Sequence, residues 1–274
     1  HARWVRHIAF NQVGALAAVV DPTPLATLLA TPGALRASID AGRVPADLFA
    51  GFLVEPLQGE GGYVLGTPEF LRDAESTCRA HDALLLFDEV QSFGRSGTLL
   101  LGEQSGAKPD AIALAKGLFA SAMVARADLD QHLHGGWHSN TWGGGKIFDN
   151  QIAYAVLDVM LHEKSPVLLG RTYPENLRLK GRLLEAGFAE LQRRHPSLVT
   201  GSMVKGGLAR LSVRRRADVI RAGWRRGVKL LGCGRAGEVA SIRTIWLADV
   251  LAKEVREGMD LLDLALTDVE ATPG

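Results

Sequence analysis

The chain has 274 residues, of which 47% are hydrophobic and 22% charged, and its 31 basic residues nearly balance 30 acidic ones. This balance gives no reason to expect nucleic acid as a partner, and no apolar run approaches the ~20 residues of a transmembrane helix. Cys78 and Cys233 lie far apart and lack metal-ligand spacing. We therefore expect reduced thiols in a cytoplasmic protein, with neither a disulfide nor a metal site.

In chain order, the first clear element is a helix that starts at Thr67-Pro68-Glu69, with Thr67 as the N-cap and proline in the first turn. The helix leads to 83–87, a short and continuously apolar run typical of a strand buried on both faces of a parallel sheet. Two more apolar stretches, 110–115 and 119–124, flank Lys116 and predict core strands. The apolar face of the helix follows i,i+4 spacing, with Phe70, Ala74 and Cys78.

The C-terminal part changes character. Long amphipathic helices are predicted at 150–161 and 177–195, the first closing a large domain and the second opening a small one. We accordingly predict a partial large domain over 1–165 and a small domain over 166–274. The fold class is α/β, with a mainly parallel sheet and a small C-terminal α+β domain. A βαββα pattern is expected in the small domain over 208–213, 217–226, 228–231, 242–246 and 254–266.

Asp88 follows the 83–87 strand directly, so its side chain is expected at the carboxyl end of the sheet, where open α/β sheets bind ligands. A carboxylate there can pair with a pyridinium nitrogen, and a lysine from the next strand end, Lys116, can form a Schiff base. These residues favour a pyridoxal phosphate site. The alternatives are structural: an Asp-Glu pair can cap the next helix, and a lysine after an apolar run can extend to solvent.

Several separated motifs then agree in order with one family. Residues 53–62 resemble "EPIQGEGG", residues 87–97 resemble "DEVQTGFGRTG", and residues 139–144 resemble "STFGGNP". From about residue 52 to about residue 266 the chain therefore resembles the class III (omega) aminotransferases, which are fold-type I pyridoxal-phosphate enzymes. The tryptophan in the last motif is most similar to the lysine 6-aminotransferases.

The resemblance implies pyridoxal 5′-phosphate as cofactor and assigns roles to matching residues. Asp88 would hold the pyridinium nitrogen, Gln91 would donate to the phenolic oxygen, and Lys116 would be both the Schiff-base residue and the proton carrier. Thr141 would reach the phosphate of a neighbouring subunit, which implies a homodimer. For Thr141 a local loop hydrogen bond is the alternative.

The resemblance also implies a substrate subsite. Arg243 falls at the first arginine of "IRFxPPL", which binds the substrate α-carboxylate, and Glu60 matches the glutamate that pairs with it when a distal amine is presented. The implied reaction moves an amino group from an amino acid donor to a 2-oxo acid, with lysine, ornithine and 4-aminobutyrate as candidate donors. Because residues 244–247 lack the family's two prolines, a surface cation on an edge strand is the alternative for Arg243.

Family members are much longer, and their N-terminal region carries a Gly-Ser/Thr-rich helix start that cradles the phosphate. No such motif occurs in residues 1–50, so we expect that region to be missing. Two alternatives to an aminotransferase stay open: a catalytically silent relative or fragment that serves as a structural partner, and a pyridoxal-phosphate-dependent racemase using the same lysine.

Overall fold

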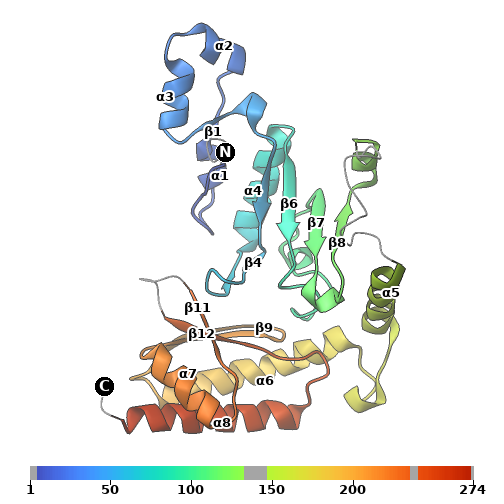
Figure 1. Ribbon diagram of the computed structural model, residues 1–274, viewed down its shortest axis with the longest axis vertical. Coiled ribbons are helices and arrows are strands. Elements are labelled where there is room, and N and C mark those ends of the chain that lie inside the picture. Colours follow the sequence, from blue (N-terminus) through green and yellow to red (C-terminus); the bar gives the residue numbers. More distant parts are fainter. Residues whose placement is uncertain (1–4, 133–146, 235–239, 273–274) are drawn as a thin grey trace.

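The computed structural model describes residues 5–132, 147–234 and 240–272. Two four-stranded sheets organise this part of the chain (Figure 1). The first stands upright in the figure, and the second, from the C-terminal region, lies below it. None of the helices in the described ranges combines the length and the hydrophobicity that a membrane span requires.

The first sheet is the α/β unit that the sequence predicts. Its strand order is β3-β6-β7-β8, in which β3 pairs with β6 and β6 with β7 in parallel. Helix α4 connects β3 to β6 and packs on the sheet, forming one core cluster with strand residues such as Leu85 and Phe87. The bounds are β3 Gly51–Val54, α4 Pro68–Ala80, β6 Leu84–Asp88, β7 Ala111–Leu114 and β8 Ala122–Ala125.

Helix α4 begins where the sequence predicts. The hydroxyl of Thr67 accepts a hydrogen bond from the backbone N–H of Phe70 at 3.2 Å, and Pro68 occupies the first turn. Phe70, Ala74 and Cys78 are all buried, as their i,i+4 spacing requires. The predicted helix start and its apolar face are confirmed.

Strand β8 differs from the prediction. The stretch 119–124 was expected to be a core strand, and that expectation is wrong: all four residues of β8 are exposed, and Phe119 is 77% exposed. The strand pairs antiparallel with β7 at the edge of the sheet, so it has one neighbour only within the described chain. Helix α5, Ile147–His162, packs instead on the short 3₁₀ helix η4, Lys116–Leu118.

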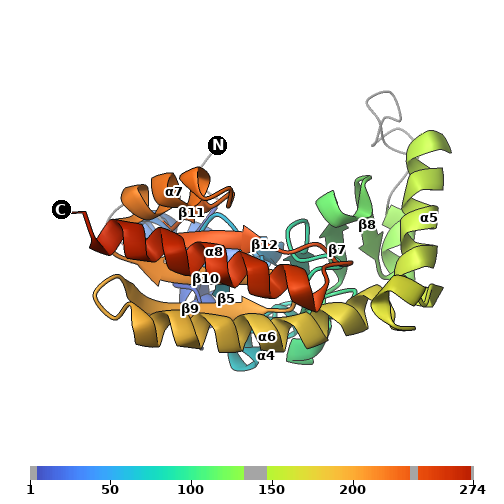
Figure 2. The same ribbon diagram turned by 90° about the horizontal axis from the view of Figure 1, so that it is seen from below.

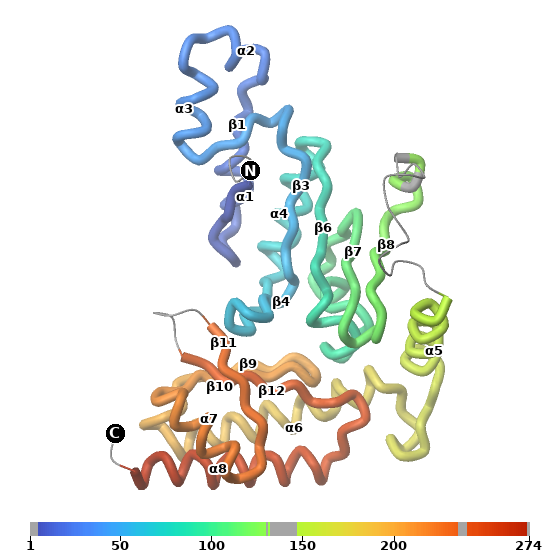
Figure 3. Tube along the Cα trace, in the orientation of Figure 1, coloured from blue at the N-terminus to red at the C-terminus, as the bar shows by residue number. Residues whose placement is uncertain are grey.

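Residues 5–50 form a small unit of short elements, seen at the blue end of the trace in Figure 3. Strands β1 and β2 pair in parallel, and Leu16 joins the core beneath α4. The bounds are α1 Ala15–Val19, β1 Val20–Asp21, α2 Leu25–Ala30, α3 Ala34–Asp40, β2 Val44–Pro45 and the 3₁₀ helix η2 Ala46–Leu48.

The second sheet is antiparallel with the order β11-β12-β10-β9. Helices α6 and α8 lie side by side beneath it (Figure 2), and α7 packs on α8. The predicted βαββα pattern is present, but strand β9, which precedes it, was not predicted from the sequence. The bounds are α6 Tyr173–Arg194, β9 Val199–Lys205, β10 Leu208–Val213, α7 Arg216–Arg225, β11 Leu231–Cys233, β12 Ser241–Ile245 and α8 Ala252–Glu270.

A short hairpin joins the two sheets. Its strands β4, Leu57–Gln58, and β5, Val64–Leu65, follow directly after β3. Leu57 and Tyr63 pack with Leu208 of the second sheet in one buried cluster. The loop of this hairpin therefore lies between the carboxyl end of the parallel sheet and the antiparallel sheet. The remaining 3₁₀ helices are η3 Gly102–Ser105, η5 Ala127–His132 and η7 Pro166–Leu168.

Candidate functional site

Asp88 and Lys116 lie at the carboxyl ends of two neighbouring parallel strands. Asp88 ends β6 opposite Ala113 of β7, and Lys116 follows three residues after Ala113. Lys116 has a φ of 45°, in the left-handed region that non-glycine residues seldom adopt and that often accompanies functional sites. At the next residue, a Cβ on Gly117 would come within 2.6 Å of the Phe93 carbonyl oxygen. Glycine therefore lets the chain turn tightly beside the loop that follows β6.

A line of hydrogen bonds runs from Lys116 into the core. Its Nζ donates to Oε1 of Gln91 at 2.5 Å, and Nε2 of Gln91 donates to the hydroxyl of Tyr63 at 3.0 Å. Because an ammonium group can only donate, the carbonyl side of the amide must face Lys116. Burial raises the pKa of Tyr63, with the Gln91 hydrogen bond acting in the opposite sense. Tyr63 is therefore a neutral phenol that can accept from Gln91 at physiological pH.

Arg243 approaches the same tyrosine from the second sheet. Its guanidinium carbon lies 5.6 Å from the centre of the Tyr63 ring, and its Nη1 lies 2.7 Å from Oε1 of Glu60. This ion pair is not an aligned hydrogen bond: within the described ranges, Nη1 and Nε of Arg243 have no hydrogen-bond partner. The arginine side chain is 12% exposed, whereas the Glu60 side chain is 80% exposed. The buried guanidinium is thus held by Glu60 without an aligned hydrogen bond, so another carboxylate, the group that a guanidinium binds best, could replace Glu60.

The two acidic residues after β6 have different surroundings. Glu89 is fully buried, and its carboxylate accepts hydrogen bonds from Leu101 N at 2.7 Å, Gly102 N at 2.6 Å and Ser92 Oγ at 2.8 Å. Burial raises the pKa of Glu89 while these hydrogen bonds oppose the rise. Asp88 is half-buried, and in the described part of the chain its carboxylate accepts only from Val90 N, at 3.0 Å. Glu89 thus anchors a loop, and Asp88 keeps acceptor capacity at the sheet edge.

Four of the six predicted site residues form two adjoining pairs, and Asp88, which accepts only from Val90 N in the described ranges, belongs to neither pair. Lys116 meets Gln91, and Arg243 meets Glu60, while Thr141 lies outside the described residues. Sequence reasoning missed Tyr63, which touches both pairs. Its position directly after Gly61-Gly62 was the available signal, because an aromatic residue at the end of a glycine-rich turn has few places to pack other than across that turn. No group of three or more metal-ligating side chains occurs in the described ranges.

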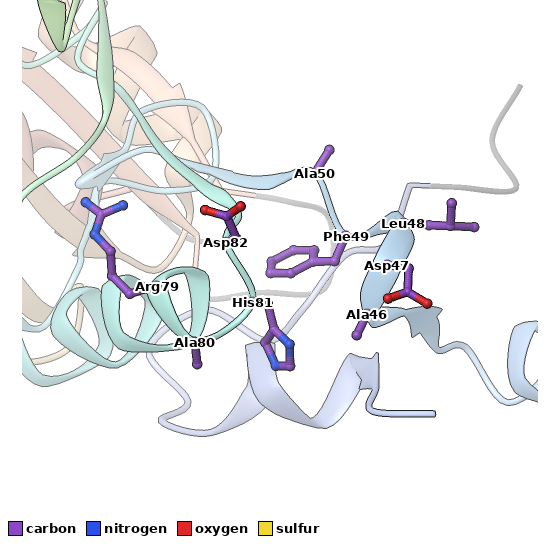
Figure 4. A pocket seen from close by; sticks show the side chains of 9 residues that line it. All are labelled: Ala46, Asp47, Leu48, Phe49, Ala50, Arg79, Ala80, His81 and Asp82. Carbon is purple, nitrogen blue, oxygen red and sulfur yellow. The ribbon is translucent and has the colours of Figure 1, made fainter. Parts of the chain in front are cut away.

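A hollow of about 820 Å³ lies elsewhere and is not this site (Figure 4). Its lining comes from residues 46–50 and 79–82, next to the amino-terminal starts of β3 and β6. Arg79, the cation at its rim, is held by Asp110 through two hydrogen bonds of 2.7 and 2.8 Å. This hollow is therefore at the opposite edge of the sheet from Asp88 and Lys116.

Comparisons with known proteins agree with this arrangement. The aminotransferase class-III family model matches residues 33–266. Acetylornithine aminotransferase from Agrobacterium fabrum is 33% identical over 87% of this chain and 56% of its own length. L-lysine-epsilon aminotransferase from Amycolatopsis lactamdurans is 33% identical over 63% of this chain and 38% of its own length. The chain thus spans about half the length of the curated relatives it matches.

Solved structures give the same fold. Acetylornithine aminotransferase from Elizabethkingia anophelis superposes with a TM-score of 0.75 at 23% identity, over 95% of this chain and 62% of that one. Lysine aminotransferase from M. tuberculosis superposes with a TM-score of 0.70 at 26% identity, over 86% of this chain and 53% of that one. The predicted α/β architecture of a fold-type I enzyme is confirmed. With its family model matched over most of its length, the chain belongs to the class III aminotransferases.

Proposed function

We propose that this chain carries part of a pyridoxal-phosphate-dependent site that moves an amino group from an amino acid to a 2-oxo acid. The observation that supports it most is the unbroken series of contacts from Lys116 through Gln91 and Tyr63 to Arg243 and Glu60. A lysine amine at one end and, at the other, a guanidinium that can bind a carboxylate when Glu60 moves away match the two ends of an amino acid substrate.

The residues at the sheet edge fit the ring end of the cofactor. Asp88 keeps acceptor capacity for a protonated ring nitrogen, and Lys116 offers the amine for covalent attachment. One amide N–H of Gln91 donates to the Tyr63 hydroxyl, and the second could donate to the phenolic oxygen of the cofactor. In the partner subunit of a proposed homodimer, Thr141 would contact the phosphate. Free cysteines at positions 78 and 233 support the cytoplasmic location that we also propose.

When bound, pyridoxal phosphate supplies an electron sink for the carbon that loses its proton. Lys116 would take that proton from the substrate at Nζ and deliver it to a neighbouring carbon of the cofactor, acting first as general base and then as general acid. The carbonyl oxygen of Gln91 would direct the amine, because it accepts from Nζ. Asp88, as an anion, would favour the protonated form of the ring nitrogen and so strengthen electron withdrawal.

The pairing of Glu60 with Arg243 supports donors with a terminal amine, such as lysine, ornithine or 4-aminobutyrate. While Glu60 neutralises the guanidinium, the donor's α-carboxylate has no free positive charge there, so its distal amine is favoured for reaction. A 2-oxo acid acceptor requires the opposite state, with its α-carboxylate on Arg243. Because the Glu60 side chain is 80% exposed, its move into solvent costs little.

One observation favours a second candidate, a catalytically silent relative. Helices α1, α2 and α3 have only five, six and seven residues, and their N-caps Gly14, Pro24 and Gly33 make no side-chain capping hydrogen bond. None of these three offers the long helix start that usually cradles a phosphate.

We also propose a domain boundary at residue 165, between α5 and α6.

The test mixes the chain with pyridoxal phosphate and one donor at a time, and follows formation of pyridoxamine phosphate by chromatography. Lysine, ornithine and 4-aminobutyrate should each be compared with L-alanine, and Lys116→Ala should give no product. Conversion of L-alanine to D-alanine without pyridoxamine phosphate would favour the racemase. No conversion of any donor by a folded chain would favour the silent relative.

A further inference from the structure

Tyr63 is fully buried, yet it touches both ends of the candidate site. Its hydroxyl accepts from Gln91 at 3.0 Å, and its ring lies under the Arg243 guanidinium at 5.6 Å. Gln91 in turn accepts from Lys116. One side chain therefore contacts both the amide that directs the reacting lysine and the arginine that would bind a carboxylate.

The backbone around Tyr63 keeps this side chain in place. Its φ is 54°, in the left-handed region, and its N–H donates to the carbonyl of Gly59 at 3.4 Å within the β4–β5 turn. Leu57, Leu101 and Leu208 pack with it in a closed cluster. Tyr63 thus has little freedom to change rotamer, and a group that rests on it is held in a fixed place.

Arg243 has two partners of unequal mobility. Glu60 comes from the same turn as Tyr63 but is 80% exposed, so it can be exchanged for a substrate carboxylate. Tyr63 is buried and cannot move into solvent. Its ring attracts the partly desolvated guanidinium of Arg243 whichever anion is bound. The aromatic contact therefore persists when the anion changes.

We propose that Tyr63 is a positioning residue that holds Arg243 while Glu60 and a substrate carboxylate exchange, and that its hydroxyl fixes the Gln91 amide toward Lys116. This inference rests on the proposed function. It separates two roles in one side chain: the ring serves the carboxylate subsite, and the hydroxyl serves the lysine. Removal of the hydroxyl and removal of the ring should accordingly have different effects.

The test compares Tyr63→Phe, which keeps the ring, with Tyr63→Leu, which removes it, in the full chain. Calorimetric binding of glutarate reports on Arg243, and Arg243→Gln should abolish it. We expect Tyr63→Phe to bind glutarate within about twofold of the parent and Tyr63→Leu to bind about tenfold more weakly. Phe70→Leu, which removes a buried ring in α4 away from the site, should leave glutarate affinity unchanged and controls for lost packing.

A second measurement follows the hydroxyl. Trinitrobenzenesulfonate labels free amines, and peptide mapping gives the rate at Lys116. Tyr63→Phe should label Lys116 about threefold faster than the parent, because an unfixed Gln91 accepts from Nζ less of the time. If the parent binds glutarate through Arg243 but neither Tyr63 variant changes affinity or labelling, the positioning role is refuted while the proposed function stands. If the parent binds no glutarate, the carboxylate subsite and this inference fail together.

Discussion

The ammonium of Lys116 and the amide of Gln91, 25 positions apart in sequence, are joined by a hydrogen bond of 2.5 Å. The contact exists because β6 and β7 are parallel neighbours, so the segments after them meet at one edge of the sheet. The amide accepts from the lysine without carrying a charge, so it can orient Nζ while leaving the amine able to lose its proton.

Gln91→Glu should therefore slow Schiff-base formation. A carboxylate beside Nζ favours the protonated lysine, and the reactive neutral amine should become about tenfold scarcer at a given pH. The check is the rate at which absorbance develops when pyridoxal phosphate is mixed with each protein. Gln104→Glu makes the same chemical change in η3, where the side chain contacts Thr98, and should leave that rate at the parent value.

Asp88→Asn should cost far more activity than it costs stability, because Asp88 accepts only one hydrogen bond in the described chain. Loss of an oriented charge at a preorganised site typically costs about 10²–10³ in rate. Glu89→Gln should do the reverse: its three accepted hydrogen bonds make it a folding residue, and we expect a loss of about 1–3 kcal/mol in the free energy of unfolding. Urea melts and turnover of both variants provide the check, and equal kinetic effects would mean that Asp88 does not face the cofactor.

Asp110 should make the first, mainly parallel sheet sensitive to acid. Burial alone would raise its pKa, but hydrogen bonds from Arg79 and from Leu85 N at 2.7 Å, with the charge of Arg126, lower its pKa below the ordinary value of 3.8. A carboxyl with a depressed folded pKa contributes stability that is present above its unfolded pKa and is lost as pH falls through the folded value.

Unfolding free energy should consequently fall below about pH 4 in the parent. In Asp110→Asn it should be lower by about 2–3 kcal/mol at neutral pH and should vary less with acid. Asp260→Asn, at an exposed position on α8, controls for the loss of one carboxyl. Parallel pH profiles for Asp110→Asn and the parent would show that the Asp110 cluster does not set the acid limit.

Glu60→Gln should strengthen carboxylate binding at Arg243. The substitution removes the competing anion, and since Glu60 is mostly exposed the fold should lose less than about 1 kcal/mol. We expect glutarate to bind about threefold more tightly, and α-amine donors such as L-alanine to gain relative to lysine. Glu257→Gln, which breaks an exposed pair with Lys253 on α8, is the matched control. Unchanged affinity in Glu60→Gln would mean that this glutamate does not compete for the arginine.

Much of the frame was predictable because it depends on local signals. Thr67-Pro68 specified the start of α4, and the apolar run 83–87 specified a parallel strand that places Asp88 at its carboxyl end, although only one face of that strand is fully buried. The family motifs correctly predicted that Lys116 lies near Gln91 and that Arg243 lies near Glu60. These contacts follow from the order of the strands in the sheets and from the positions of the family motifs along the chain.

What the sequence could not give depends on long-range packing. An apolar composition at 119–124 cannot distinguish a central strand from an edge strand, because that depends on which chain segments lie beside it. Tyr63 belongs to no motif, and its contact with Arg243 arises only where the β4–β5 turn meets β12. Glu89 resembled a helix cap, but its two backbone donors belong to residues 101 and 102, which only the folded loop brings near.

The assignment of Lys116 as the lysine that binds the cofactor can be tested directly. The chain is mixed with pyridoxal phosphate, reduced with borohydride and digested, and the labelled peptide is found by mass spectrometry. We expect label on Lys116, none at that position in Lys116→Arg, and less label on Lys116 in Asp88→Asn. Label that maps to another lysine, such as Lys108 or Lys146, or that is unaffected by Asp88→Asn, would contradict the assignment of this site.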